Sequence, residues 1–173
     1  MKHIREYLLR DDLYEGLRLS SELLEHNALL TPILKKNFGE MSANESNTLQ
    51  CMESTDTYLR ESELKQKCSG NIILEATLKV MKKELPYQLI KELQTTSLLF
   101  GELLVKHNVK VRFAEQQILL HFDSKSGKVR LGRSHIMYLP SSNKAVCYVQ
   151  ELLVSEEELK NSQHKYQMER IYN

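Results

Sequence analysis

The spacing of apolar positions predicts helices in the first part of the chain. Leucines recur at roughly helical intervals through the first 24 residues, which is typical of amphipathic helices. Thr31 followed by Pro32 resembles a helix N-cap and first helical position, so a short helix is expected over residues 33–37. Gly39 should end this helix, and the polar residues 40–47 are expected to form a loop.

Beyond residue 47 the period changes to two, which is typical of strands. Tyr58, Arg60, Ser62 and Leu64 would share one face of a strand. A turn at residues 69–71 would join it to an antiparallel partner. The other strands expected from alternation cover residues 72–80, 109–122, 129–139 and 145–154, with turns at 124–127 and 140–143.

Helical patterns interrupt and follow these strands. Pro86 should open one helix, and residues 98–107 should form a second. Ser155 with Glu158 three residues later has the form of a capping box, so residues 155–173 are expected to begin a surface helix. Since no linker or repeat interrupts the chain, we predict a single domain over residues 1–173, with an N-terminal helical segment over 1–28 and a meander-like sheet.

The composition is that of an ordinary globular domain. The chain has 173 residues, of which 41% are hydrophobic and 27% charged, and its formal net charge is +1. This length suits one domain with its own core. The balanced charge gives no reason to expect nucleic-acid binding through bulk electrostatics.

Targeting signals are not expected either. Charges interrupt the apolar positions of the first 16 residues, so these do not resemble a secretory signal peptide. No run of about 18 apolar residues predicts a membrane span. Cys51, Cys68 and Cys147 have no metal-like spacing, so reduced thiols and a cytoplasmic protein are expected.

Two charged residues break the apolar pattern of their expected strands. Glu151 shares a face with Cys147 and Val149, and Arg60 shares one with Tyr58. An inward acid suits a proton donor, and an inward arginine can hold a carboxylate through two parallel hydrogen bonds. The alternative is that Arg60 and Glu151 pair with each other or face solvent.

The strand over residues 129–139 carries a second candidate group. Arg133 and His135 would alternate with Leu131 and Met137 on one face, which is either an exposed sheet face or the basic lining of a pocket for an anion. Glycine-rich phosphate loops, a Gly-x-Ser-x-Gly motif and zinc-like histidine spacing are all missing from the sequence. Neither a metal nor a cofactor is therefore expected.

Four groups of residues resemble, in order, motifs of the chorismate–pyruvate lyase family. They are Leu29-Leu30-Thr31; Tyr58-Leu59-Arg60-Glu61; Phe100-Gly101-Glu102-Leu103-Leu104; and Gly132-Arg133-Ser134 with Val149-Gln150-Glu151-Leu152-Leu153. The resemblance spans residues 29–154. It implies an α+β fold in which a single antiparallel sheet of about six strands encloses a ligand pocket and is flanked by helices.

By this resemblance the protein would release pyruvate from chorismate to give 4-hydroxybenzoate, or act on a close analogue, without a cofactor or metal. Arg60 would hold one substrate carboxylate, and Glu151 would be the general acid or the partner of the 4-hydroxyl group. The residues implied to contact the rest of the substrate, including its second carboxylate, are Leu30, Arg112, Val129, Leu131 and Arg133, with Lys106 as a further candidate for that carboxylate.

One motif position departs from the family. Glu102 stands where the bacterial lyases have an arginine, and an acid there would repel an anion. This favours an alternative: a non-catalytic domain that binds a small aromatic acid, as the ligand-sensing domains of some bacterial regulators on this fold do. Only about 28 residues precede the first motif, so a DNA-binding domain is not expected.

A third hypothesis is an interaction module that presents its N-terminal helices or residues 156–173 to a partner. The partners expected overall are a small anionic aromatic or cyclohexadienyl ligand, no nucleic acid and no membrane. The protein would be a monomer or a homodimer.

Overall fold

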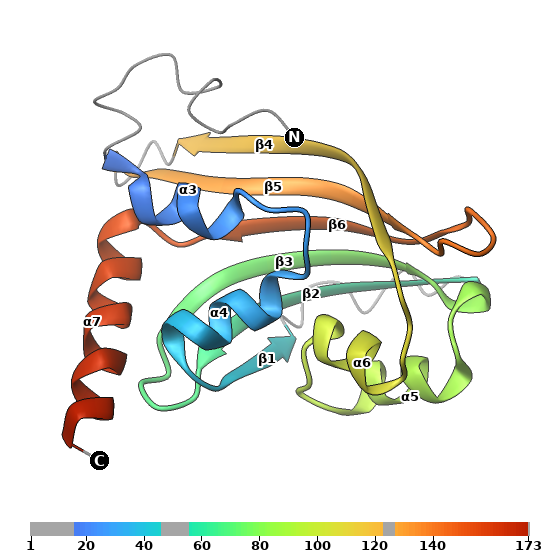
Figure 1. Cartoon of the computed structure of the whole chain (residues 1–173), viewed down its shortest axis with the longest axis horizontal. Helices are drawn as coiled ribbons and strands as arrows, with labels where there is room; N and C mark the ends of the chain where they lie inside the picture. The colour runs from blue at the N-terminus through green and yellow to red at the C-terminus, as the bar shows by residue number, and fades with distance from the viewer. Residues whose placement is uncertain (1–15, 46–55, 123–126, 173) are drawn as a thin grey trace.

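The computed structural model describes residues 16–45, 56–122 and 127–172, and shows one six-stranded antiparallel sheet flanked by helices (Figure 1). The strand order is β1-β2-β3-β6-β5-β4. The strands are β1 (Met41–Glu45), β2 (Thr57–Gln66), β3 (Ile72–Met81), β4 (Arg112–Phe122), β5 (Val129–Tyr138) and β6 (Ala145–Leu153). The expected α+β class and single antiparallel sheet are confirmed.

The helices pack mainly on one face of this sheet. They are α3 (Arg18–Leu24), α4 (Leu30–Phe38), the short 3₁₀ helix η2 (Lys82–Glu84), α5 (Tyr87–Thr95), α6 (Phe100–Lys106) and α7 (Glu156–Tyr172). Helices α3 to α6 cover what we call the inner face, whereas α7 lies along one end of the sheet (Figure 1). No helix within the three described ranges has both the length and the apolar character to cross a membrane.

The order of the strands differs from a simple meander. β2 and β3 form one hairpin, but β3 then pairs with β6, while β4 lies at the far edge of the sheet. The segment containing α5 and α6 provides the long connection from β3 to β4. As a result, β6 with Glu151 lies beside β3, and β5 with Arg133 lies beside β6.

Two local predictions are corrected by the structure. Residues 40–47 contain β1, an edge strand whose Met41 and Ala43 are buried and whose backbone pairs with β2. Helix α4 begins at Leu30, three residues earlier than expected, with Pro32 in the first helical turn. Proline is tolerated there because the first backbone N–H groups of a helix have no partner within it. The helix expected over residues 1–15 and most of the turn at 124–127 lie outside the described residues.

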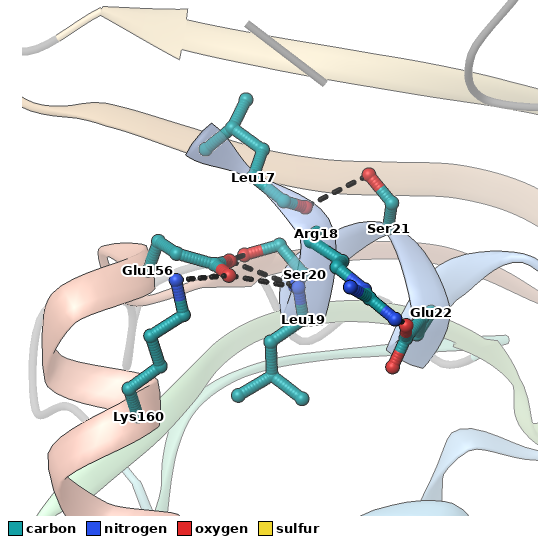
Figure 2. A network of polar contacts seen from close by, with 8 residues as sticks. All are labelled: Leu17, Arg18, Leu19, Ser20, Ser21, Glu22, Glu156 and Lys160. Carbon is teal, nitrogen blue, oxygen red and sulfur yellow. Dashed lines mark hydrogen bonds and ion pairs between the residues drawn. The ribbon is translucent and has the colours of Figure 1, made fainter. Parts of the chain in front are cut away.

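Helix α3 is held in place by an acid from the other end of the chain. Glu156, the first residue of α7, accepts hydrogen bonds from the backbone N–H of Leu19 at 2.7 Å and from the N–H and hydroxyl of Ser20 at 2.9 and 2.6 Å (Figure 2). Lys160 lies 3.3 Å from the same carboxylate. A carboxylate suits a helix N-terminus, where unpaired N–H groups meet the positive end of the helix dipole.

Candidate functional site

Four ionisable side chains lie together on the inner face in two neighbouring rows of the sheet. Glu151 is registered with Arg133, and in the next row Val149 is registered with His135. Arg60 lies in the second of these rows, since it pairs with Leu78, which pairs with Val149. We call Arg60, Arg133, His135 and Glu151 the polar band.

The polar band separates two apolar clusters. One cluster contains the buried residues of α3, α4 and one end of the sheet, including Leu64, Leu74 and Leu153. The other contains the buried residues of α5, α6 and the opposite end, including Val80 and Met137. The band therefore crosses the middle of the core, at the boundary between these clusters.

All four side chains of the band are removed from solvent. Arg133 is 1% exposed, Arg60 and His135 are each 2% exposed, and Glu151 is 9% exposed. The alternative of an exposed sheet face for Arg133 and His135 is therefore wrong. Since an unpaired buried charge is strongly unfavourable, the contacts of these groups decide their role.

Arg133 is the most extensively bonded member of the band. Its Nε donates to Oε2 of Glu151 at 2.6 Å, Nη1 donates to the carbonyl oxygen of His26 at 3.1 Å, and Nη2 donates to that of Ala28 at 3.3 Å. His26 and Ala28 belong to the connection between α3 and α4, which lies over the inner face. Arg133 thus joins an ion pair within the sheet to the segment that covers it.

Arg60 makes a similar contact to a second covering segment. Its Nη1 donates to the carbonyl oxygen of Leu98, between α5 and α6, at 3.2 Å. Arg60 and Glu151 are separated in the register by one strand and one row, and Glu151 pairs with Arg133 instead. Both expected residues point to the same inner face, but each is engaged with a different partner.

His135 is the member of the band with the least hydrogen bonding. Neither of its ring nitrogens has a hydrogen-bond partner among the described residues, and the ring packs edge-on against Phe113 with centroids 5.1 Å apart. Burial, followed by the charge of Arg133 and the proximity of His26, lowers the pKa of His135 to about 3. The imidazole is therefore neutral near pH 7, with one donor and one acceptor nitrogen.

The other expected site residues fall into two groups. Leu30 and Leu131 are buried in the apolar cluster beneath α3 and α4, and Val129 packs against that cluster. Arg112 lies on the outer face of the sheet, where its guanidinium stacks 4.6 Å from the ring centre of Tyr138. The structure does not bring Arg112 together with the polar band.

Glu102 has a local structural role at the start of α6. Its Oε2 accepts the backbone N–H of Leu99 at 2.9 Å, and its other oxygen forms an ion pair with Lys35. The carboxylate therefore caps α6 and links it to α4. Lys106, the other candidate for a second carboxylate, pairs with Glu92 at 2.7 Å near the surface.

Two glycines of the quoted motifs are required by close packing. A Cβ atom on Gly132 would lie 2.4 Å from the carbonyl oxygen of Glu151, and one on Gly101 would lie 2.6 Å from Oγ1 of Thr31. Gly132 lets β5 approach β6 beside the Arg133–Glu151 pair, and Gly101 lets α6 approach α4. The two glycines therefore allow the close packing that places α6 against α4 and Arg133 beside Glu151.

Two grooves of the described surface lie outside the inner face, and one of them reaches a member of the polar band. That groove is on the outer face of the sheet and is lined by His135 together with Lys79, Tyr148 and Gln150, among others; the second lies between β3, β5 and the start of α7. Nowhere in the described ranges do three or more His, Cys, Asp or Glu side chains gather in a way that could hold a metal ion.

Comparisons with known proteins give only distant similarities. No protein-family model matches this sequence, and no curated protein matches it. Among solved structures, the ligand-binding domain assigned to a GntR-family transcriptional regulator from Bordetella bronchiseptica is similar with a TM-score of 0.46 and 9% identity, over 68% of this chain and 81% of that one.

Two further solved structures are similar at the same level. PhnF from Mycobacterium smegmatis has a TM-score of 0.46 and 11% identity, over 69% of this chain and 56% of PhnF. The regulator YydK from Bacillus subtilis has a TM-score of 0.45 and 10% identity, over 68% and 60%. TM-scores this low carry no argument about ligand or activity. These comparisons do not support the expectation that nucleic acid is excluded as a partner.

Proposed function

We propose that this chain forms one non-catalytic domain that binds a small anionic ligand at the polar band. The observation that carries this proposal is the burial of two guanidinium groups and one imidazole on the same helix-covered face. A guanidinium presents planar, paired N–H donors that match a carboxylate or phosphate. Arg60 is the primary anion-binding residue in this proposal, with Arg133 one row away.

The contacts of the arginines suggest how a ligand would enter. Arg60 and Arg133 now donate to neutral carbonyl oxygens of Leu98, His26 and Ala28. Hydrogen bonds to a charged acceptor are roughly twice as strong as those to a neutral one. An anion would therefore displace these carbonyls, and the segments at residues 25–29 and 96–99 would lift from the sheet as it binds.

The contacts of the acids support a non-catalytic role. A lyase would need Glu151 to deliver a proton, but Oε2 of Glu151 accepts the Nε–H of Arg133 at 2.6 Å. Glu102, which stands in place of a family arginine, is engaged as the cap of α6. Neither acid is arranged to act on a ligand that Arg60 holds unless these contacts first break.

Calorimetric titration of the full chain with benzoate and 4-hydroxybenzoate tests the proposal. We expect binding that weakens at least tenfold, or by about 1.4 kcal/mol, in Arg60→Gln. Arg112→Gln is the matched control, since Arg112 lies on the outer face and should leave the affinity unchanged. Equal losses in the two variants, or no binding of either acid, would contradict the proposal.

The lyase is the second candidate, favoured by the inward position of Glu151 beside a buried arginine. It predicts that the protein releases pyruvate from chorismate and that Glu151→Gln abolishes the release. The binding-domain proposal predicts pyruvate at the uncatalysed rate from both proteins. Catalysed release that depends on Glu151 would favour the lyase and reject the non-catalytic role.

A further inference from the structure

A β-bulge in β4 lies directly opposite His135. Ala114 pairs with Ile136 and Gln117 pairs with Ser134, so two residues of β4 face the single residue His135. Glu115 takes up the extra length: its φ is +55°, and its Oε1 accepts the hydroxyl of Tyr138 at 3.1 Å. A non-glycine residue in this left-handed region is uncommon and is favoured here by the bulge geometry.

The bulge changes which side chain of β4 faces the polar band. In a regular strand the side chains alternate, and Phe113 on the inner face would be followed there by position 115. The extra residue moves Gln116 to the inner face instead, next to Ile118, which is registered with Arg133. Gln116 therefore lies in the same row as His135. Its amide nitrogen is buried and has no hydrogen-bond partner within the described part of the chain.

A third residue with a buried nitrogen that lacks a hydrogen-bond partner within the described ranges comes from the covering segment. Nδ1 of His26 accepts the backbone N–H of Ala28 at 3.1 Å and lies 3.5 Å from Nη1 of Arg133. Because Nδ1 is an acceptor, the ring proton of neutral His26 is on Nε2, as assigned from these contacts. That Nε2 is also buried, and no described residue accepts its hydrogen bond.

We infer that Gln116, His135 and His26 form a subsite that recognises a neutral hydroxyl or carbonyl oxygen of the ligand. This inference rests on the proposed function and names the ligand class: a small acid that carries a neutral oxygen substituent at a distance from its charged group. Gln116 and His26 supply N–H donors, and His135 supplies one donor and one acceptor. A hydroxyl group, which both accepts and donates, matches this set.

The register gives the spacing between the two parts of the site. Leu78 and Val149 lie between Arg60 and His135 in this row and form its apolar part. Three strand intervals separate Arg60 from His135, or roughly 14 Å between Cα atoms, and an arginine side chain is long enough to span part of this distance. A ligand with an apolar ring between its acid and its hydroxyl would lie across Leu78 and Val149.

Burial makes this subsite selective. A buried donor or acceptor without a partner is unfavourable, so a ligand oxygen that supplies the partner gains affinity over an analogue that lacks it. An exposed hydroxyl-binding group would discriminate less, because water would take the place of the ligand oxygen.

Titration of the full chain with benzoate and its 2-, 3- and 4-hydroxy derivatives tests the inference. The wild-type protein should bind at least one hydroxylated isomer tenfold more tightly than benzoate. This preference should fall below threefold in Gln116→Leu and in His135→Phe. Gln117→Leu is the matched control: it removes the neighbouring amide, which is exposed, and should keep the wild-type preference.

The outcomes separate the inference from the proposed function. If benzoate binds in an Arg60-dependent way but no isomer is preferred, or the preference survives in Gln116→Leu, the inference is overturned and the binding function stands. If none of these acids binds, the proposed function fails as well. Should His135→Phe not fold, Gln116→Leu and the imidazole ¹⁵N resonances of His135, which should shift with the hydroxylated isomer but not with benzoate, decide the question.

Discussion

Arg133 on β5 and Glu151 on β6 form a buried ion pair, with Nε and Oε2 2.6 Å apart, in the middle of the inner face. The same guanidinium donates to backbone carbonyl oxygens of the connection between α3 and α4. Arg133 therefore joins β5 to β6 through its ion pair with Glu151. It also binds the segment between α3 and α4 that covers the proposed site.

Breaking this pair from one side should destabilise the fold. Glu151→Gln leaves Arg133 as a buried charge without its counter-ion, and such losses are about 3–5 kcal/mol. Urea unfolding should show this decrease in the free energy of unfolding, whereas Glu84→Gln, at the more exposed pair with Lys144, should change it by less than about 1 kcal/mol. The double variant Arg133→Met/Glu151→Leu should recover most of the loss. Equally small decreases in the free energy of unfolding for Glu151→Gln and Glu84→Gln would contradict this account.

His135 should make the protein less stable in acid. Its pKa is about 3 in the folded chain and near 6.5 when unfolded, so between these values the unfolded state binds more protons. The free energy of unfolding that depends on neutral His135 is fully present above pH 6.5. It decreases as the pH falls toward 3, by up to about 1.4 kcal/mol per pH unit. The free energy of unfolding of His135→Gln should fall less steeply between pH 6.5 and 4 than that of wild type. His121→Gln, at an exposed position on β4, should follow the wild-type curve.

The fold and part of the site could be predicted from the sequence. Alternation groups Arg60, Arg133 and Glu151 with apolar residues on one face of their strands, which makes an inward position one of two open alternatives, because a strand with one buried face fixes the direction of every side chain. The partner of Glu151 could not be predicted, since it depends on the order of strands: Arg133 is nearest only because β5 lies next to β6.

Other features depend on contacts between distant segments or on local irregularities. The mostly polar residues of β1 predict a loop, and only pairing with β2 makes this segment a strand. Gln116 was missed because a bulge reverses the alternation that a sequence pattern assumes. The sequence comparison predicts Glu102 as a changed pocket residue, whereas it caps α6; the capping-box signature does not mark this role, because position 99 is a leucine and not a serine or threonine.

The contact between Glu156 and α3 should contribute measurably to stability. Glu156→Ala removes a carboxylate that accepts three hydrogen bonds at a helix N-terminus, and we expect a loss of about 2 kcal/mol or more. The amides of Leu19 and Ser20 should also exchange faster with solvent. The adjacent Glu157→Ala, at an exposed position, should have little effect on either measurement. Unchanged exchange at Leu19 in Glu156→Ala would show that the contact does not hold α3.

The spacing of β5 and β6 should not tolerate a side chain at Gly132. Gly132→Ala places a Cβ 2.4 Å from the backbone oxygen of Glu151, so the strands must separate, and overpacking of this kind is unfavourable by about 1–3 kcal/mol. Thermal unfolding should detect the loss. Gly16→Ala is the control, because no atom lies within 4 Å of the Cβ built there and the substitution should be close to neutral. A wild-type melting temperature for Gly132→Ala would contradict the packing described for β5 and β6.

The most direct test of the binding site is an NMR titration that follows the arginine Nε and histidine imidazole resonances of the full chain as 4-hydroxybenzoate is added. The account predicts saturable shifts at Arg60 and His135, with smaller shifts at Arg133 as the segment at residues 25–29 lifts. Saturation that shifts the backbone amides of Lys79, Tyr148 and Gln150 at the outer-face groove while the Nε resonance of Arg60 stays unchanged would contradict it.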